Sequence, residues 1–241
     1  MNDIELAARF ALPPNSKRYC GKPSFVSAFR AYLSFHQPKQ AANLRNELAK
    51  FKAHYSYLKL IALASGLKPF DARVAEAFWI GNSLLGKVKK KELQSLIANE
   101  FCGKGMLSKK KAQEMASSLP NGFAPHHSFH VLYLHTISGV IEKSVKNADM
   151  CRVSWGKVIG VEEGRVKVKT QKLVRVKGKL ALLPAVKKWK TSCAGIALLP
   201  DAKPGDIVAS HWGFAAMKIS KNQAKRLQKA TENNVSVPNR A

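Results

Sequence analysis

Acidic side chains are scarce in this chain. Its 241 residues include 15 Asp or Glu against 41 Lys or Arg, which gives a formal net charge of +26. So few carboxylates disfavour catalysis by paired acids and bases. The sequence also lacks the motifs of phosphate-binding loops, dinucleotide-binding folds, zinc proteases and serine hydrolases. These absences predict a protein that is not a stand-alone enzyme.

Long hydrophobic runs are absent too. The longest, residues 58–67, is short and contains Lys59, whereas a membrane span needs about 18 apolar residues. The first residues show no basic segment followed by an apolar one, so we expect no secretory signal. A cytoplasmic protein that makes no membrane contact is the resulting prediction.

Cysteines are few and widely separated. They are Cys20, Cys102, Cys151 and Cys193. Because no two of them form a CxxC element, the sequence does not predict a zinc ribbon or knuckle. In a reducing compartment we expect no disulfides either.

The basic charge is densest in the second half of the chain. Residues 1–145 contain 21 Lys or Arg and 9 Asp or Glu, whereas the shorter segment 146–241 contains 20 and 6. Residues 165–190 contain ten basic side chains and no acidic one. Such a field attracts nucleic acids or acidic partners. A solubilising surface is the alternative interpretation.

The first half has the hydrophobic spacing of helices. Apolar residues in segment 39–65 recur at alternating steps of four and three, which predicts one helix ended by Gly66 and Pro69. Further helices are expected at 24–35, 71–85, 89–101 and 109–119. Their apolar stripes indicate packing rather than a cofactor site.

The second half has the pattern of strands. Residues 165–169 alternate strictly between basic side chains and valine, as a half-buried strand does. Turns are expected at 162–164 and 177–178, a strand at 207–212, and a last helix at 221–232 after the capping box of Ser220 and Gln223. We therefore predict an α+β protein. An all-α helical domain (1–147) precedes a small antiparallel OB-like β-barrel with a C-terminal helix (148–232) and a flexible tail (233–241).

Two short strings place a thiol and an imidazole at the ends of expected strands. Cys151 lies in the string at residues 150–158, at the start of an expected strand, and His211 lies in the string at residues 205–215, at the end of another. If the strands between them form a barrel, the two side chains face each other at one end. A soft sulfur and a neutral imidazole together suit a transition metal.

The same two strings resemble the HypC/HupF family of hydrogenase-maturation chaperones over residues 150–232. The matching positions are Met150, Cys151, Gly156, Lys157, Val158, Gly205, Asp206, Val208, His211, Gly213, Phe214 and Ala215. The resemblance implies an OB-like barrel that carries iron for the nickel–iron hydrogenase centre together with a partner protein. It makes Cys151 the metal-binding or partner-bonding thiolate and His211 a second ligand or orienting base. The chain departs from the family in the 150 residues before Cys151 and in Trp155, which replaces a proline.

Four of the seven histidines lie within ten residues. They are His126, His127, His130 and His135. Spacings of three and four residues would put His127 or His126 on one helix face with His130, and such pairs bind metals. If this segment reaches Cys151, we expect His130 to be the third ligand. A loop that packs against the barrel is the alternative.

These features lead to two functional hypotheses. The first is a non-enzymatic metallocentre-assembly chaperone, or a descendant of one, that handles iron through Cys151, His211 and His130. The second is a basic OB-like RNA-binding protein. Its phosphate contacts would be Lys167, Lys169, Lys172 and Arg175, and its stacking residues Trp189, Trp155, Trp212 and Phe214.

Overall fold

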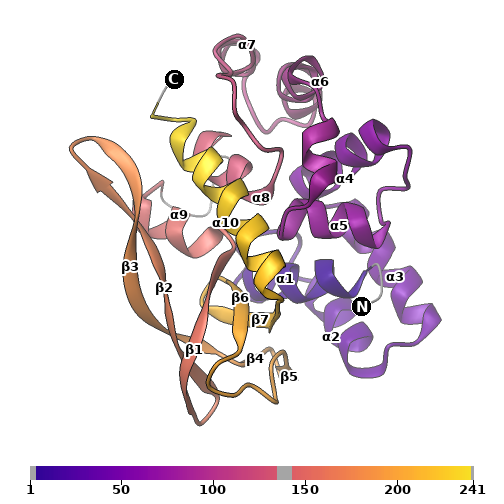
Figure 1. Ribbon diagram of the computed structural model, residues 1–241. Coiled ribbons are helices and arrows are strands. Elements are labelled where there is room, and N and C mark those ends of the chain that lie inside the picture. The colour runs from indigo at the N-terminus through magenta and orange to yellow at the C-terminus, as the bar shows by residue number, and fades with distance from the viewer. Residues whose placement is uncertain (1–3, 135–142, 240–241) are drawn as a thin grey trace.

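Helices form most of the first half of the molecule, and strands with one long helix form the rest (Figure 1). The computed structural model describes residues 4–134 and 143–239. The first helices are α1 (Glu5–Ser16), α2 (Phe25–Phe35), α3 (Pro38–Ala49), α4 (Lys52–Ser65), α5 (Ala72–Trp79), η1 (Ser83–Lys87), α6 (Lys90–Ser95), the π-helical η2 (Leu96–Phe101) and α7 (Lys109–Ser117). They are followed by α8 (His127–Phe129), the π-helical η3 (His130–Leu134), α9 (Val145–Cys151) and, after the strands, α10 (Lys221–Ser236).

The prediction of a single helix over residues 39–65 is wrong. The segment is divided into α3 and α4 because Phe51 adopts an extended conformation, with ψ at 97°, between them. The predicted end of α4 is confirmed, since Gly66 takes a left-handed conformation with φ at 67°, which glycine adopts at little cost. The hydrophobic spacing correctly predicted helix on both sides of Phe51, but it did not predict the break between the two helices.

Five strands form one sheet in the order β1, β2, β3, β7, β6, and β6 also pairs with β1. Their bounds are β1 (Ser154–Glu162), β2 (Arg165–Val176), β3 (Lys179–Lys190), β6 (Ile207–His211) and β7 (Phe214–Lys218); β4 (Ser192–Cys193) and β5 (Ile196–Ala197) form a separate pair. The predicted antiparallel OB-like barrel is wrong. The sheet is mixed, and β3 meets β7 through a single parallel pair, Lys190 with Phe214. An odd number of strands cannot alternate in direction all the way round, so one junction has to be parallel.

Side chains from both halves of the chain share a hydrophobic core. Phe10 of α1 and Phe78 of α5 belong to the same buried cluster as Ala216 of β7 and Leu227 of α10. In Figure 1, α10 lies between the strands and the N-terminal helices. The division at residue 147 stays a prediction, and α9 runs across it.

The C-terminal helix begins as the sequence predicts. The Ser220 hydroxyl accepts the Gln223 backbone N–H at 3.1 Å, and the Gln223 side chain accepts the Ser220 N–H at 2.9 Å. The helix continues through Ser236, so it includes the first four residues of the segment expected to be a tail. Within residues 4–134 and 143–239, every helix is too short or too polar to cross a bilayer.

Candidate metal centre

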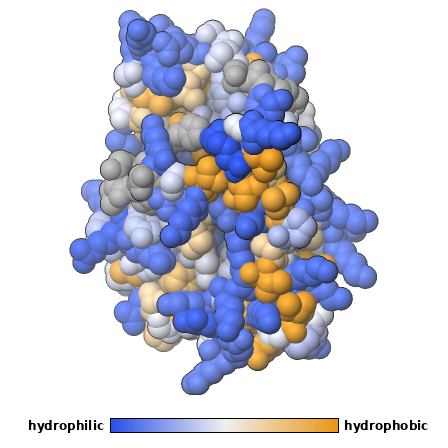
Figure 2. Space-filling view, turned by 90° about the vertical axis from the view of Figure 1, so that its left-hand side faces the viewer, coloured by the Kyte–Doolittle hydropathy of each residue, from blue (hydrophilic) through white to orange (hydrophobic). Residues whose placement is uncertain are grey.

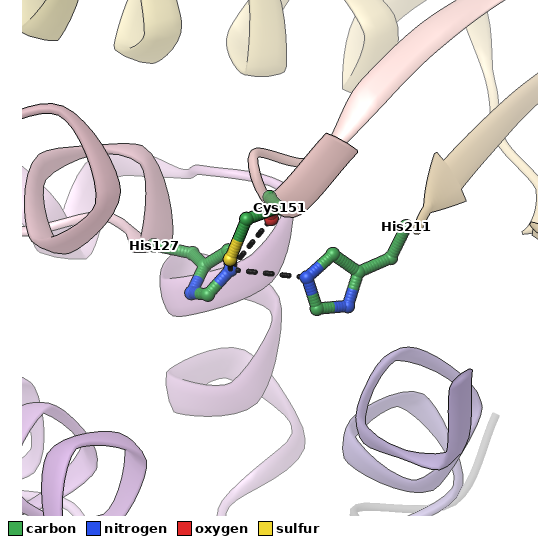
Figure 3. A group of neighbouring side chains, drawn as sticks. All are labelled: His127, Cys151 and His211. Atoms are coloured by element: carbon green, nitrogen blue, oxygen red, sulfur yellow. Dashed lines mark hydrogen bonds between the residues drawn. The ribbon is translucent and has the colours of Figure 1, made fainter. Parts of the chain in front are cut away.

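Three side chains that can bind metal converge where the helices meet the strands. They are His127 at the start of α8, Cys151 at the end of α9 and His211 at the end of β6. One ligand atom from each lies within 4.8 Å of the others. Figure 3 shows the thiol and both rings directed toward a common point.

The His211 ring is held by a carbonyl that a proline leaves free. Pro14 lies inside α1 and has no N–H, so it cannot make the helical bond to the Phe10 carbonyl four residues earlier. His211 Nδ1 lies 2.6 Å from that oxygen. Because a carbonyl only accepts, Nδ1 carries the proton and Nε2 keeps its lone pair for the cluster.

Burial keeps His211 neutral. Removal from water lowers the pKa of His211 to about 4, although its hydrogen bond to the Phe10 carbonyl raises it. The ring is therefore neutral near pH 7, which is the form that binds metals. A backbone carbonyl on the other ring nitrogen is also the usual second-shell partner of a metal-binding histidine.

His127 stands at a tightly fixed turn. The Asn234 side chain on α10 bonds to the N–H and C=O of Ala124 at 2.9 and 3.0 Å and to the Ser128 hydroxyl at 2.9 Å. The His126 ring accepts the Ser128 N–H at 3.1 Å, which caps α8. The turn therefore presents His127 at a fixed place and angle.

The His127 ring links the other two members of the cluster. Its Nε2 lies 3.0 Å from the Cys151 carbonyl and 3.3 Å from His211 Nε2 (Figure 3). Both neighbours are acceptors, so Nε2 of His127 carries the proton in the ion-free protein. Burial lowers the pKa of His127 well below its ordinary value, and charge on His211 would lower it further.

The Cys151 sulfur completes the cluster as a protonated thiol. It lies 4.0 Å from His127 Nε2. Burial raises the pKa of Cys151 far above its ordinary value, and Cys20 raises it further, whereas a hydrogen bond with the Trp212 side chain lowers it. With neutral imidazoles beside it, nothing in the described residues converts this thiol to a nucleophilic thiolate at neutral pH.

A buried ion network anchors the residue after Cys151. Arg152 is almost completely buried and donates to the Asp149 carboxylate from Nε at 3.1 Å and from Nη2 at 2.9 Å. The same carboxylate accepts the Leu173 N–H at 2.9 Å and the Lys187 ammonium at 2.5 Å. This network fixes the end of α9 against β2 and β3, and with it the position of Cys151.

The cluster forms part of the wall of a cavity of about 490 Å³. Ten of the lining residues are apolar or aromatic: Ala11, Pro14, Tyr19, Phe25, Phe51, Ala53, Phe78, Trp79, Met106 and Trp212. Lys22, Lys50 and Lys52 line it as well. Cys20 and His54 also line it. Neither ring nitrogen of the buried His54 has a hydrogen-bond partner among the described residues, and burial lowers the pKa of His54 to about 3. The cavity therefore contains an unsatisfied polar group beside a group of metal ligands.

The structure brings Cys151 and His211 together, as the sequence predicts, and adds His127 in place of His130. The His130 ring lies on the same cavity but packs edge-on against Tyr57 and Phe101, with centroids 5.7 and 5.9 Å away. His135 lies outside the described residues. The three-residue spacing between His127 and His130 was a signal for His127 in the sequence. Spacing alone does not show which of the two rings faces Cys151.

The residues expected to contact RNA are separated. Trp189 is 2% exposed, Trp212 and Phe214 are buried as well, and Trp155 packs partly buried against the main core. Lys167 and Lys169 are exposed on one face of β2, whereas Lys172 has the opposite parity and Arg175 donates to the Gly178 carbonyl at the hairpin turn. Three of the four expected stacking residues are buried, and Trp155 is only partly exposed.

A family model described as a family of unknown function, DUF6390, matches residues 2–241. The chain belongs to the DUF6390 family. Comparisons with curated proteins and with solved structures found no match. The predicted resemblance to the HypC/HupF family is wrong, because the family model that matches covers the chain from end to end and is a different one. The two short strings that suggested it are features of a DUF6390 protein.

Proposed function

We propose that this DUF6390 protein binds a transition-metal ion through the Cys151 thiolate and the imidazoles of His127 and His211. One observation carries the proposal: three potential ligand atoms lie within 4.8 Å of one another at the wall of a largely apolar cavity. Thiolate and imidazole ligands suit zinc, copper, iron and nickel better than magnesium or calcium.

The protonation states favour a metal over a catalytic thiol. A nucleophilic cysteine needs a neighbouring cation or base that lowers its pKa, but burial here keeps the thiol and both imidazoles neutral. A bound ion supplies the missing positive charge and deprotonates a coordinating thiol.

Binding requires different adjustments from the two histidines. His211 has its proton on Nδ1 and offers Nε2 without change. His127 has to move its proton from Nε2 to Nδ1, and it loses its hydrogen bond to the Cys151 carbonyl. His211 is thus the preorganised ligand, and His127 is the ligand that adjusts as the ion enters.

Three protein ligands beside a cavity suit metal handling. Structural zinc sites are closed by four protein ligands, whereas three leave a position for an exchangeable group. We therefore propose that the ion is exchanged or delivered through the cavity. We propose further that the ion is iron and that a partner protein receives it.

The test is metal titration of ion-free protein in the absence of oxygen. Cobalt(II) is a suitable first probe because thiolate ligation gives it a charge-transfer absorption, and zinc and ferrous iron follow in competition with it. We expect one ion per chain with thiolate absorption. The Cys151→Ala variant should lose both signals.

Cys20→Ala is the matched control. Cys20 lines the same cavity but does not belong to the cluster, so its loss should leave the stoichiometry and the thiolate absorption intact. Equal binding by the wild-type protein and Cys151→Ala would overturn the proposal.

A further inference from the structure

Six basic side chains lie on the outward side of the strands β1, β2 and β3. They are Lys157, Arg165, Lys167, Lys169, Lys188 and Lys190, and we call them the outer sheet face. All six are exposed, while the valines between them on β2, Val166 and Val168, are buried. The alternation of side chains along the strand therefore gives the sheet one buried apolar side and one exposed charged side.

The register of the strands pairs these like charges directly. Lys157 lies opposite Lys169, Lys167 opposite Lys188, and Arg165 opposite Lys190. Residues directly opposite each other project on the same side, and like charges in such pairs destabilise a sheet. Three unfavourable pairs of cations thus lie on this face. A bound anion would offset the repulsion within each pair by contacting both of its cations.

Few acidic groups neutralise this face. Glu162 is the one acidic residue in β1, β2 and β3, and its carboxylate pairs with Lys188 at 2.8 Å. Glu162 also acts electrostatically on Arg165 and Lys167, which lie nearby. Among the described residues, Lys188 is the one member of the outer sheet face in an ion pair, so five cations remain for an external ligand. Figure 2 views the molecule from the side where these strands lie and shows mostly hydrophilic residues around several hydrophobic patches.

The chemistry of the face favours a phosphate backbone over a membrane. Membrane-binding surfaces use large apolar or aromatic side chains beside their cations. This face has no exposed aromatic residue, and its exposed apolar neighbours are the branched residues Ile159 and Val186, 46% and 55% exposed. Rows of cations without stacking surfaces suit contacts to phosphates rather than to bases.

We propose that the outer sheet face binds the phosphodiester backbone of a nucleic acid without reading its sequence. The proposal is independent of the metal centre and shares no residue with it. Binding of this kind releases condensed counterions, so it weakens steeply as salt rises.

The test compares two variants that lose the same charge. In the first, Lys157, Lys167 and Lys169 on the outer sheet face become glutamine. In the second, glutamine replaces Lys172, Lys177 and Lys179, which lie on the opposite side of the β2–β3 hairpin or in its turn. Fluorescence anisotropy with a labelled single-stranded RNA of about 20 nucleotides, longer than one typical binding site, is measured from about 50 to 200 mM salt.

We expect the first variant to lose affinity and to lower the salt slope by about 0.7 for each contact removed on a single strand. The second variant should keep both close to the wild-type values. Equal losses in the two variants, or no RNA binding by the wild-type protein at about 50 mM salt, would overturn the proposal. Tighter binding to anionic phospholipid vesicles than to RNA would do so as well. Far-ultraviolet circular dichroism and urea denaturation show whether both variants keep the fold.

Discussion

The metal centre and the outer sheet face are opposites in their electrostatics. Removal from water keeps Cys151, His127 and His211 uncharged. On the outer sheet face the lysines stay solvated and charged, and of these five only Lys188 has an ion-pair partner among the described residues. The centre should therefore respond to pH and to metal, and the face to salt.

One carboxylate connects the metal centre to the β2–β3 hairpin, whose strands carry five of the six residues of the outer sheet face. Asp149 accepts hydrogen bonds from Arg152, next to Cys151, and from the Leu173 N–H and the Lys187 ammonium on the β2–β3 hairpin. Arg152 is buried without another acidic partner among the described residues. The hairpin and the metal centre thus depend on the same buried ion pair.

The largest effect that we predict comes from breaking this connection. Asp149→Asn leaves the Arg152 charge buried and unpaired, which typically costs about 3–5 kcal/mol. The matched comparison is Glu162→Gln, which removes the exposed pair with Lys188 and should cost at most about 1 kcal/mol. Urea denaturation measures both. Equal losses of unfolding free energy in the two variants would show that the buried network stabilises the protein no more than the exposed ion pair does.

The next largest effect separates two buried histidines that line the same cavity. His211→Ala should weaken metal binding by more than the 10- to 100-fold that loss of a second-shell partner usually costs. His130→Ala removes a ring that packs on Tyr57 and Phe101, so it should lower stability and leave metal affinity nearly unchanged. Competition against a chelator measures the affinities. A reversed order of the two would restore His130 as a ligand and reject the geometry described for His211.

The sequence predicted much of the local structure and two of the three side chains of the centre. Helix ends at Gly66 and Ser220 follow from conformational and capping preferences that act within a few residues. Cys151 and His211 were predicted to meet, and they do. The mixed sheet was not predicted, because the pairing of Lys190 with Phe214 joins strands across 23 intervening residues that carry no local signal for it.

Three parts of the centre escaped prediction for the same reason. Whether His127 or His130 faces the thiol depends on how Asn234, about a hundred residues later, holds the turn. The Phe10 carbonyl is free because of Pro14, but its partner His211 lies 201 residues away. Asp149 likewise meets Lys187 only in the folded sheet. Spacing along the chain reports none of these contacts.

Pro14 offers a smaller and more selective test. Pro14→Ala restores an N–H that competes with His211 for the Phe10 carbonyl, so we expect roughly a 10-fold loss of metal affinity, the lower end for second-shell changes. Pro13→Ala is the matched control, because its N–H would be directed at the Arg9 carbonyl instead. The same chelator competition compares them. If both substitutions weaken binding equally, general disturbance of α1 explains the loss and the carbonyl has no specific role.

The metal centre should also show a pH dependence that the outer sheet face does not share. Burial raises the pKa of Cys151 far above neutrality, so each bound ion displaces about one proton, and metal affinity should rise about tenfold per pH unit between pH 6 and 8. The histidines add nothing in this window, because burial already lowers the pKa of His211 to about 4. Toward pH 4 the slope should steepen as His211 takes up a proton. Lysines stay charged throughout, so RNA affinity should be flat from pH 6 to 8 and fall with salt instead. A flat metal affinity over that range would mean that Cys151 is not the ligand, since a buried thiol cannot coordinate without losing its proton.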